Sequence, residues 1–532
     1  MPKTRVVIIG AGMGGLAAAL RLADTDASVT VLEAAAAPGG KMRQVQAGGK
    51  GFDAGPTVLT MKWVFDDLLS GLNTSLEDEV MLERADVIAR HYWAGAAALD
   101  LHADVDKSAD AIGMFSGPED AAGYRQFAAD SKRVFETLKD TFINAPRPNP
   151  VTLSQRIGLH RIADMLALRP FSTLWTALGG YFPDPRLRQL FGRYATYCGS
   201  SPFAAPATLM LVAHVEQAGV WLPKDGMHAI ARRFQALAET YGVSFRFGAR
   251  ADQIELDGSE RKVAAVRLSS GEVIEADRII FNGDVSALQE LLAPVRARGC
   301  RKVPDAKRSQ SALVSCGVAR AEGVPLTHHT VFFSDDYEAE FKAVFRDRAA
   351  PADPTVYVCA QDRNSSGEAQ SMGVDAACER IYCLMNLPAD GDTHSYSTSE
   401  LEQCLTAIDR RLAKNGLTLH RDREAQVVTA PDGFNKLFPA TGGALYGQAS
   451  HGWMASFSRL GAKGKLSGLY LAGGSVHPGP GIPMAALSGK LAAEQVMTDA
   501  AMTGRFPRAA ISGGMSTRPA TAAPTPSRSL PS

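Results

Sequence analysis

The sequence predicts an α/β protein whose nucleotide-binding domain is assembled from separate stretches of the chain. Three observations predict this fold class. A β-branched run at residues 5–9 leads into a glycine-rich turn and then into a helical pattern. A second strand, glycine turn and helix lie near the other end of the chain, at residues 468–493, and short strands at residues 244–281 lie between the two. Such apolar strands are typical of a parallel sheet, so we expect one discontinuous Rossmann-type sheet with other domains inserted into it.

The composition excludes several classes of protein. The 532-residue chain is long enough for two or three domains. Lys and Arg number 56, as do Asp and Glu, so the formal net charge is zero and nothing indicates a nucleic-acid partner. Seven scattered cysteines without a Cys-x-x-Cys pair predict reduced thiols, no disulfide framework and no metal site.

The first glycine turn has the spacing of a dinucleotide-binding site. Gly10 allows the tight turn, Gly12 lets a pyrophosphate approach the backbone, and Gly15 lets the helix pack closely on the strand, with Gly14 in the same turn. The unpaired N–H groups and the positive dipole end of the helix then face the phosphates. This glycine pattern alone is weak evidence, but its position between a strand and a helix strengthens it.

The second predicted strand, Ser28–Leu32, ends on the acidic residue Glu33. A carboxylate at this position accepts hydrogen bonds from the ribose hydroxyls and repels a 2′-phosphate. The sequence therefore predicts FAD or NAD and excludes NADP.

The next glycine-rich loop favours FAD. Gly40 and Lys41 belong to a Gly-Gly-basic element at residues 39–41, which resembles the loop of glutathione-reductase-type flavoproteins. That resemblance implies that the glycines pass over the cofactor and that the basic side chain meets its phosphates. Arginine is usual at the basic position, so Lys41 supplies a single ammonium charge in place of a planar guanidinium. Arg43 is an alternative residue for the phosphate contact. Further cofactor contacts are expected from the following loop, at Gly55, Pro56 and Thr57.

The C-terminal glycine turn is expected to close the same site. Many Gly and Pro residues at the end of a strand indicate that the backbone approaches a ligand closely. The helix that follows directs its N-terminus towards the flavin N1/O2 region, where negative charge grows on reduction. The expected contacts are Gly473, Gly474, Gly481, Ile482, Pro483 and Met484.

The middle of the chain is expected to complete the flavin domain. Residues 244–247, 263–268 and 273–275 alternate as a small β-meander, and residues 278–281 form another strand. The backbone of Ala251, after the first of these strands, is the expected adenine contact. A plain antiparallel sheet without a ligand remains an alternative for this segment.

Together these segments resemble the bacterial phytoene desaturase family of carotenoid desaturases, from about Val6 to Ala493. The most specific matches are residues 52–57, 219–223, 282–285 and 477–483. Residues 191–203 and 215–217 are most similar to the hydroxyneurosporene and methoxyneurosporene desaturases, whereas the Gly-Gly usual after residues 219–223 is absent. The resemblance implies an FAD-dependent oxidoreductase that introduces a C-3,4 double bond into acyclic 1-hydroxy or 1-methoxy carotenoids. Phytoene-type desaturation is the alternative.

The sequence specifies no obvious acid–base pair. The candidates are Glu216, Asp225, His228 and His477, each more readily explained as structural, so we expect FAD to be the only catalytic group. An apolar tunnel is expected to hold the polyene. Two other function classes are a flavin amine oxidase, which needs an aromatic cage, and a non-catalytic protein like the Rab escort relatives, which should lack the C-terminal turn.

A carotenoid substrate implies contact with a membrane surface. No clean run of about 20 apolar residues appears, so we expect a cytoplasmic protein bound peripherally to the inner or photosynthetic membrane. Residues 156–193 carry six arginines and two aspartates, and the apolar residues at 159–168 keep helical spacing, which suits a helix in an anionic interface. An ordinary solvated helix is the alternative. The electron acceptor, quinone or oxygen, is not specified.

The expected domains follow from these segments. Residues 1–89, 221–295 and 446–500 form the FAD domain, 90–220 a helical cap that faces the membrane, 296–445 a mixed-sheet substrate domain, and 501–532 a disordered tail.

Overall fold

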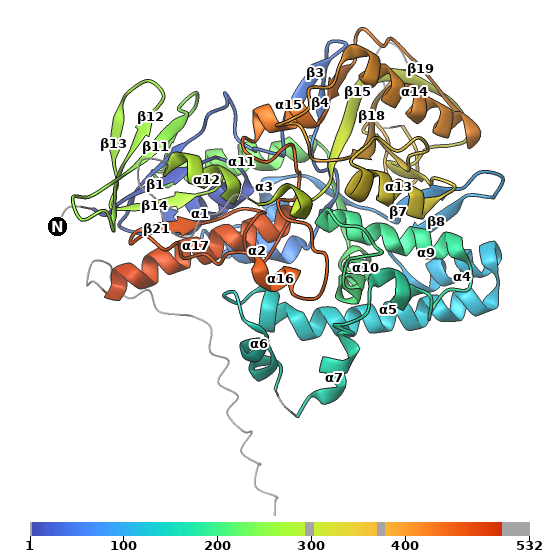
Figure 1. Ribbon diagram of the computed structural model, residues 1–532, viewed down its shortest axis with the longest axis horizontal. Helices are drawn as coiled ribbons and strands as arrows, with labels where there is room; N and C mark the ends of the chain where they lie inside the picture. The colour runs from blue at the N-terminus through green and yellow to red at the C-terminus, as the bar shows by residue number, and fades with distance from the viewer. Residues whose placement is uncertain (1–2, 159, 293–302, 370–377, 503–532) are drawn as a thin grey trace, which may run out of the picture.

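The computed structural model describes residues 3–158, 160–292, 303–369 and 378–502, without the side chains of residues 501 and 502. The expected tail began at residue 501, but residues 501 and 502 belong to the last helix, which runs from Ile482 to Met502. The rest of the expected tail, 503–532, and the expected boundary at 295/296 lie outside the described residues. The two termini of the described chain lie in the same domain, at the left of Figure 1.

A five-stranded parallel sheet, in the order β10-β2-β1-β14-β21, forms the centre of this domain. Its strands come from three distant stretches of the chain, which confirms the discontinuous α/β fold. The strands are β1 (Arg5–Ile9), β2 (Ser28–Leu32), β10 (Ser244–Arg246), β14 (Arg278–Phe281) and β21 (Leu469–Leu471).

Alternate residues of β1 face two different layers. Val6 and Ile8 pack against helices on one face, and Val7 and Ile9 pack against a β-meander and a helix on the other. Both faces are therefore buried, as expected for a central parallel strand. The helical layer is α1 (Met13–Ala23), α2 (Lys62–Ser70), α3 (Leu76–Glu79), α11 (Met227–Thr240) and α17 (Ile482–Met502); the opposite layer is β11 (Ala251–Leu256), β12 (Val263–Leu268), β13 (Val273–Glu275) and α12 (Val285–Leu291).

The prediction for the first strand of this meander was wrong. Residues 244–246 form β10, an edge strand of the parallel sheet beside β2, and the meander begins with β11. β10 follows α11, which packs on α1, so the chain returns next to β2. Alternation of apolar residues does not distinguish these two sheets, because both bury one face of the strand.

An eight-stranded mixed sheet forms the second domain, at the upper right of Figure 1. Helix α14 (Thr398–Lys414) covers one face of the sheet through Leu405, Ile408 and Leu412. The strands are β7 (Val87–Tyr92), β8 (Leu99–His102), β15 (Ser311–Gly323), β16 (His329–Phe332), β17 (Val356–Ala360), β18 (Glu379–Leu387), β19 (Leu417–Arg421) and β20 (Val427–Thr429). The helices α13 (Tyr337–Lys342) and α15 (Pro431–Leu437), with η4 (Asp305–Lys307) and η5 (Ala343–Asp347), lie in the same part of the chain.

The expected boundary at 89/90 falls inside β7. This strand pairs in parallel with β16, with Arg90 opposite Thr330, and β8 pairs with β7. Residues 90–102 therefore belong to the mixed sheet and not to the helical cap. The partner of β7 is distant in the sequence, so no local pattern reveals the pairing.

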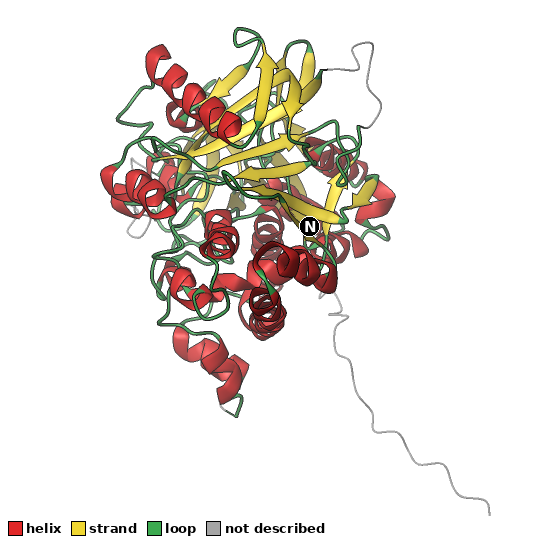
Figure 2. Ribbon diagram, turned by 90° about the vertical axis from the view of Figure 1, so that its right-hand side faces the viewer, coloured by secondary structure: helices red, strands yellow, loops and turns green. Residues whose placement is uncertain are grey.

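Helices of the cap gather below the strands in Figure 2. They are α4 (Val105–Ser116), α5 (Pro118–Leu138), η1 (Lys139–Ile143), α6 (Pro150–Ile157), α7 (Ile162–Ala167), α8 (Leu174–Leu178), α9 (Pro185–Gly192), η2 (Arg193–Cys198), η3 (Ala207–Met210) and α10 (Leu211–Gln217). Smaller elements join the domains: the hairpin β3 (Gln44–Ala47) and β4 (Lys50–Asp53), the sheet β5 (Leu59–Thr60), β9 (Val220–Pro223) and β6 (Leu82–Arg84), and α16 (Ala455–Ser458).

The continuous surface helix expected around residues 159–168 is not formed. Helix α6 ends at Ile157 and its C-cap Gly158 has φ +97°. Helix α7 begins only at Ile162 and ends at Ala167, so a short helix forms within the expected stretch. Positive φ is incompatible with continuation of a right-handed helix. Leu159 lies outside the described residues. Of the helices that the structure describes, none has both the length and the apolar character needed to cross a membrane.

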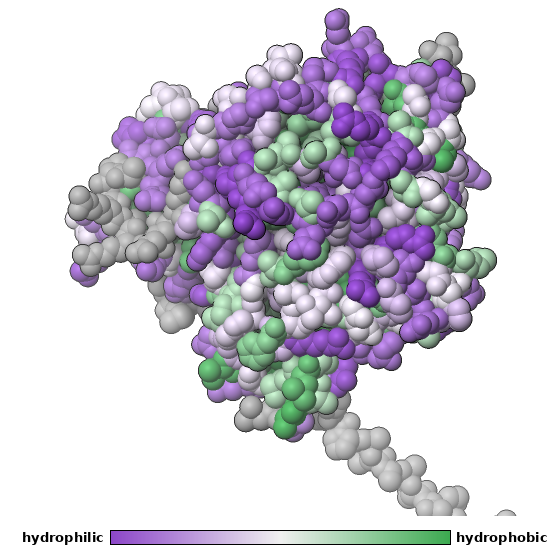
Figure 3. All heavy atoms as spheres, turned by 45° about the vertical axis from the view of Figure 1, so that its right-hand side comes forward, coloured by the Kyte–Doolittle hydropathy of each residue, from purple (hydrophilic) through white to green (hydrophobic). Residues whose placement is uncertain are grey.

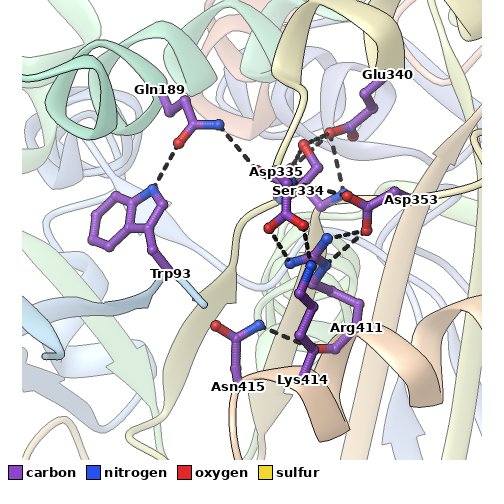
Figure 4. A network of polar contacts seen from close by, with 10 residues as sticks. Trp93, Gln189, Ser334, Asp335, Glu340, Asp353, Arg411, Lys414 and Asn415 are labelled. Carbon is purple, nitrogen blue, oxygen red and sulfur yellow. Dashed lines mark hydrogen bonds and ion pairs between the residues drawn. The ribbon is translucent and has the colours of Figure 1, made fainter. Parts of the chain in front are cut away.

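Polar side chains lock the cap to the mixed sheet (Figure 4). Gln189 of α9 accepts a 2.7 Å hydrogen bond from the indole of Trp93 and donates one of 3.0 Å to the carbonyl of Ser334. Nearby, the buried guanidinium of Arg411 binds Asp335 and Asp353. The hydrogen bonds of Gln189 join the cap to the mixed sheet, whereas the ion pairs of Arg411 fix α14 to loops of the mixed-sheet domain itself. Both sets satisfy groups that would otherwise be buried without partners.

Candidate functional site

A single large cavity of about 1020 Å³ passes between the nucleotide domain, the cap and the mixed sheet. One part is lined by the glycine turns and another by apolar side chains of the cap. All the predicted cofactor contacts except Gly15 line it, namely Gly10, Gly12, Gly14, Glu33, Gly40, Lys41, Gly55, Pro56, Thr57, Ala251, Gly473, Gly474, Gly481, Ile482, Pro483 and Met484.

Three distant stretches of chain converge at Gly14. A Cβ at this position would stand 2.5 Å from Oδ1 of Asn282 and 2.9 Å from the amide nitrogen of Gly473. Gly15 has a different role: its Cβ would stand 2.0 Å from the carbonyl oxygen of Gly10, so it allows α1 to pack on its own turn. The two glycine turns of the sequence therefore form one wall of the cavity.

Glu33 lies at the edge of this wall. Its carboxylate accepts hydrogen bonds from the backbone amides of Ala11, at 2.7 Å, and Ala35, at 2.8 Å. These bonds hold the carboxylate at the end of β2, where it lines the cavity. This position suits a carboxylate that accepts hydrogen bonds from the hydroxyl groups of a ribose.

Lys41 reaches into the cavity from the neighbouring loop. Its ammonium donates a 2.6 Å hydrogen bond to the carbonyl of Leu445, and burial lowers the pKa of its side chain. Asp284 opposes this effect. Arg43, the alternative basic residue, turns away from the cavity, donates to the hydroxyl of Thr429 and does not line the site. Of the two basic candidates, Lys41 is therefore the one that is available to a ligand.

Helix α17 and strand β11 also contribute to the wall of the cavity that the glycine turns form. Helix α17 begins at Ile482, so its first turn is directed at the cavity that Gly481 and Met484 line. At the other end, Ala251 begins β11, and the preceding turn is tied to β2 because the amide of Ala249 donates to the carbonyl of Glu33. Helix N-termini stabilise negative charge through their unpaired N–H groups.

The cap side of the cavity is apolar. Phe142, Leu153, Ile157, Met165 and Leu168 are among its lining residues. At its outer end lie Phe171 and Trp453, whose rings are 5.7 Å apart and which are 84% and 42% exposed.

Exposed apolar side chains surround this outer end. They form a surface that we name the apolar rim, composed of Val151, Ile162, Leu166, Phe171, Trp453 and Met454. Figure 3 shows hydrophobic residues gathered at the lower end of the molecule, where α6 and α7 lie in Figure 1. An exposed apolar patch of this kind is typical of an interaction surface.

Of the four candidate acid–base residues, only Glu216 lines the cavity. Asp225 is exposed on the surface. The backbone amide of His228 donates to Asp53, and its imidazole contacts the carbonyl of Pro38 at 2.9 Å. His477 contacts the carbonyl of Ala145 at 2.8 Å through Nε2, and burial lowers its pKa to about 4. The last three thus have structural positions.

Glu216 is buried and accepts hydrogen bonds from two tyrosines. The hydroxyl of Tyr194 donates to it at 2.8 Å and that of Tyr197 at 2.7 Å. Burial raises the pKa of its carboxyl group, and both hydrogen bonds oppose this effect.

Sequence reasoning missed Arg193 as a lining residue. It was counted among six arginines of a basic surface, yet it faces the cavity. Its guanidinium carbon lies 5.4 Å from the ring centre of Tyr197 and 5.3 Å from that of Tyr357. A signal was present, because residues 191–203 were the segment that distinguished the hydroxyneurosporene branch.

A second cluster brings His328, His329 and Cys359 together, with possible ligand atoms within 4.8 Å of one another. No metal was predicted here. His328 contacts the carbonyl of Arg363, and His329 contacts the hydroxyl of Tyr357. Burial raises the pKa of the Cys359 thiol, and both histidines already have a protein partner through Nδ1.

Comparison with known proteins identifies the family of this chain. The family model described as flavin containing amine oxidoreductase matches residues 13–497. The chain belongs to this family.

Within the family, the chain is similar to named desaturases over nearly its whole length. It is 48% identical to the hydroxyneurosporene desaturase of Rubrivivax gelatinosus, over 97% of this chain and 98% of that protein. The corresponding desaturase of Rhodobacter capsulatus is 40% identical, over 93% and 98%. The 1-hydroxycarotenoid 3,4-desaturase of a Flavobacterium species is 31% identical, over 92% and 99%. The chain therefore lies in the carotenoid desaturase branch of the family, as the sequence motifs indicated.

Solved structures show the same fold. A putrescine oxidase variant aligns with a TM-score of 0.58 at 13% identity, over 94% of this chain and all of that chain. An oxidoreductase from Methanosarcina mazei aligns with a TM-score of 0.59 at 15% identity, over 93% and all of that chain.

The cofactor of this flavoenzyme is FAD, and the residues of the cavity fit it. The close approach of Gly14 to Asn282 and Gly473 leaves bare backbone along one wall, which suits a pyrophosphate. Glu33, Lys41 and the first turn of α17 line the same cavity. A carboxylate accepts hydrogen bonds from a ribose, and an ammonium group neutralises a phosphate. A helix N-terminus stabilises the negative charge of a reduced flavin ring.

Proposed function

We propose that this protein is a carotenoid desaturase that introduces a C-3,4 double bond into acyclic 1-hydroxy or 1-methoxy carotenoids. The observation that carries the proposal is the continuity of one cavity, from the glycine turns to an apolar stretch that ends at the exposed rim. Such a cavity suits a long apolar chain that enters from a lipid environment. The names of the most similar relatives support the same substrate class.

The residues assigned to the cofactor belong to this proposal. Gly10, Gly12 and Gly14 would hold the pyrophosphate, Glu33 the ribose, Ala251 the adenine, and Lys41 the phosphates. Gly40, the loop Gly55, Pro56 and Thr57, and the turn from Gly473 to Met484 would enclose the flavin. When bound, FAD supplies the hydride acceptor that desaturation requires.

The side chains of the cavity would orient the substrate and exclude water. Leu153, Ile157 and Leu168 line the approach from the rim, where they would hold the polyene by apolar contact. Glu216 is the cavity-lining residue among the acid–base candidates, and its raised pKa favours the neutral acid. An allylic position next to a polyene stabilises developing positive charge, so no strong base is needed.

The apolar rim is the surface that would meet the membrane. Val151, Leu166 and Phe171 are 66%, 71% and 84% exposed, and none of them is charged. The enzyme would bind peripherally to the inner or photosynthetic membrane and draw its substrate from the bilayer. A membrane quinone or oxygen would reoxidise the flavin.

An amine substrate is disfavoured by Arg193. Tyr357 and Tyr382 line the cavity and would form part of the aromatic cage that an amine oxidase requires. The guanidinium of Arg193, however, lies over the ring of Tyr357, where an ammonium ion would be repelled.

The test is anaerobic incubation of the purified holoenzyme with liposomes that contain 1-hydroxyneurosporene or phytoene, while flavin bleaching and pigment spectra are followed. Bleaching with the hydroxylated carotenoid and a red-shifted product spectrum are expected. Faster bleaching with phytoene would replace the proposal by phytoene-type desaturation, and bleaching with neither would overturn it.

A further inference from the structure

Arg193 is a cation on the wall of the cavity, beside the rings of Tyr197 and Tyr357. It lines the cavity, and among the residues that the structure describes its hydrogen-bond partner is Tyr197, to which Nη1 donates at 3.2 Å. It forms no ion pair with any described carboxylate within 4.0 Å. A guanidinium has five N–H donors, so most of its donors are free for a ligand. Placing such a group among apolar residues costs free energy unless a polar partner joins it.

The surroundings of Arg193 hold it in place. The Tyr197 hydroxyl that receives its hydrogen bond donates in turn to Glu216, and the rings of Tyr197 and Tyr357 lie under the guanidinium. Glu216 itself is fixed by a second tyrosine, Tyr194. The position of the guanidinium is therefore set before any ligand arrives, as recognition of a single polar atom requires.

The cluster lies beside the predicted flavin loop. The hydroxyl of Tyr357 is 2.6 Å from Oγ1 of Thr57, which belongs to the loop assigned to the cofactor. In the proposed substrates the oxygen is on C-1 and the new double bond joins C-3 and C-4. The group that binds this oxygen must therefore lie close to the flavin, and Arg193 lies over the ring of Tyr357, one side chain away from the predicted flavin loop.

We infer that Arg193 binds the C-1 oxygen of the substrate and thereby selects hydroxylated and methoxylated carotenoids over hydrocarbons. The inference rests on the proposed function. A guanidinium only donates hydrogen bonds, and both a hydroxyl and an ether oxygen accept them, which explains how one residue serves both substrates. A hydrocarbon end group would leave the guanidinium without its partner, and sites built for a hydrogen bond strongly reject analogues that lack it.

The experiment compares Arg193→Met with wild-type holoenzyme on 1-hydroxyneurosporene, its 1-methoxy derivative and the hydrocarbon without the oxygen. We expect kcat/KM for both oxygenated substrates to fall about 100-fold or more, and that for the hydrocarbon to change less than about threefold. Arg193→Lys, which keeps a charged donor, should restore part of the preference. Arg188→Met is the matched control, since Arg188 lies in α9, the helix just before Arg193, and donates to the carbonyls of Phe182 and Pro183, away from the cavity.

A binding measurement accompanies the kinetics. The desaturated product keeps its hydroxyl and is not turned over, so its affinity for the holoenzyme, relative to that of a hydrocarbon with the same double bonds, reports recognition of the oxygen. Arg193→Met should abolish this difference with FAD content unchanged. If Arg193→Met does not retain FAD, Arg193→Lys decides the question through the same ratio.

Two results would overturn the inference while the proposed function stands. One is wild-type enzyme that desaturates the hydrocarbon and the hydroxylated carotenoid equally well. The other is an Arg193→Met variant whose kcat/KM falls to the same extent for all substrates and whose flavin spectrum is shifted. This result would assign Arg193 to cofactor binding. If no carotenoid bleaches the flavin, the proposed function fails, and equal binding of product and hydrocarbon would overturn the inference as well.

Discussion

Gly489 lies against Gly14 so closely that a Cβ on Gly489 would stand 2.0 Å from the carbonyl oxygen of Gly14. The contact joins α17, near the C-terminus, to α1, near the N-terminus. Because the neighbouring atom is backbone, it cannot move aside as a flexible side chain would. The two ends of the chain therefore form one wall of the flavin cavity only while this position has no side chain.

Gly489→Ala is expected to lower the free energy of unfolding by about 1–3 kcal/mol, the usual cost of overpacking a core. FAD should be lost at a lower temperature, because α1 and α17 both line its site. Thermal release of flavin, followed by fluorescence, measures this. Gly71→Ala is the control, since Gly71 has an ordinary helical φ of −64° and open space around it. Equal release temperatures for both variants and wild type would contradict the expectation.

Glu33→Ala is expected to weaken FAD binding about 10- to 100-fold, the range for hydrogen bonds to a charged group. The variant removes the proposed ribose contact and leaves the amides of Ala11 and Ala35 without their acceptor. Reconstitution of apoenzyme with FAD, titrated by flavin fluorescence, gives the affinity. Glu119→Ala, at an exposed residue of α5, should bind FAD like wild type. An unchanged affinity for Glu33→Ala would remove this residue from the cofactor site.

The double variant Leu166→Asp/Phe171→Asp is expected to reduce liposome binding about tenfold or more, because two exposed apolar side chains no longer enter the interface. Flotation with anionic liposomes measures the bound fraction. Met114→Asp is the control, since Met114 is 85% exposed but belongs to α4 and not to the rim.

Charge reversal of Arg161 and Arg169 should have a smaller effect on liposome binding. Arg161 already binds Asp164 at 2.6 Å, and Arg169 lies 3.8 Å from Asp130. Undiminished binding of the apolar double variant, with a large loss on charge reversal, would replace the rim by a basic patch as the membrane contact.

Glu216→Gln is expected to reduce kcat by less than about 10³-fold, the scale above which general acid–base catalysis would be indicated. The two tyrosines donate to different carboxylate oxygens, so Gln keeps the acceptor for one of them and presents its NH2 group to the other. FAD remains the only catalytic group that we assign. Single-turnover flavin bleaching measures the chemical step, with FAD content as the control. A larger loss with intact FAD would make Glu216 the proton acceptor of the reaction.

Acid is expected to destabilise the protein through its buried histidines. Burial lowers the pKa of His477 and His451 to about 4 and that of His91 to about 3. In the unfolded chain these groups take up protons near pH 6.5, so the unfolded state binds more protons than the folded state below that pH. The stability they contribute is present above about pH 6.5 and is lost as the pH falls towards 4.

His477→Gln should lessen this loss by up to about 1.4 kcal/mol per pH unit within that window. Thermal unfolding at about pH 7.5 and about pH 5 checks it, and His420→Gln, at an exposed residue, serves as the control. Parallel behaviour of His477→Gln and wild type would show that His477 is not held neutral.

The parts of the site that depend on local backbone geometry were predictable from the sequence. The turn at Gly10, Gly12 and Gly14, the acid Glu33 after the second strand, and the turn that opens α17 each consist of neighbouring residues whose types follow from a strand end, a close approach or a helix start. Their spacing indicated a dinucleotide, the glycine-rich loop at residues 39–41 favoured FAD over NAD, and all of them line one cavity. The match of residues 52–57 and 477–483 to known desaturases indicated the branch of the family.

Features that depend on distant partners were decided only by the tertiary structure. The strand β7 joins the mixed sheet through β16, and β10 lies beside β2, pairings that no local alternation of residues specifies. Arg193 looked like one more surface charge until the fold placed it between Tyr197 and Tyr357, inside the cavity. The type of a side chain determines what it can bind. Its burial and its neighbours determine which groups it contacts, and both result from packing between segments that are far apart in the chain.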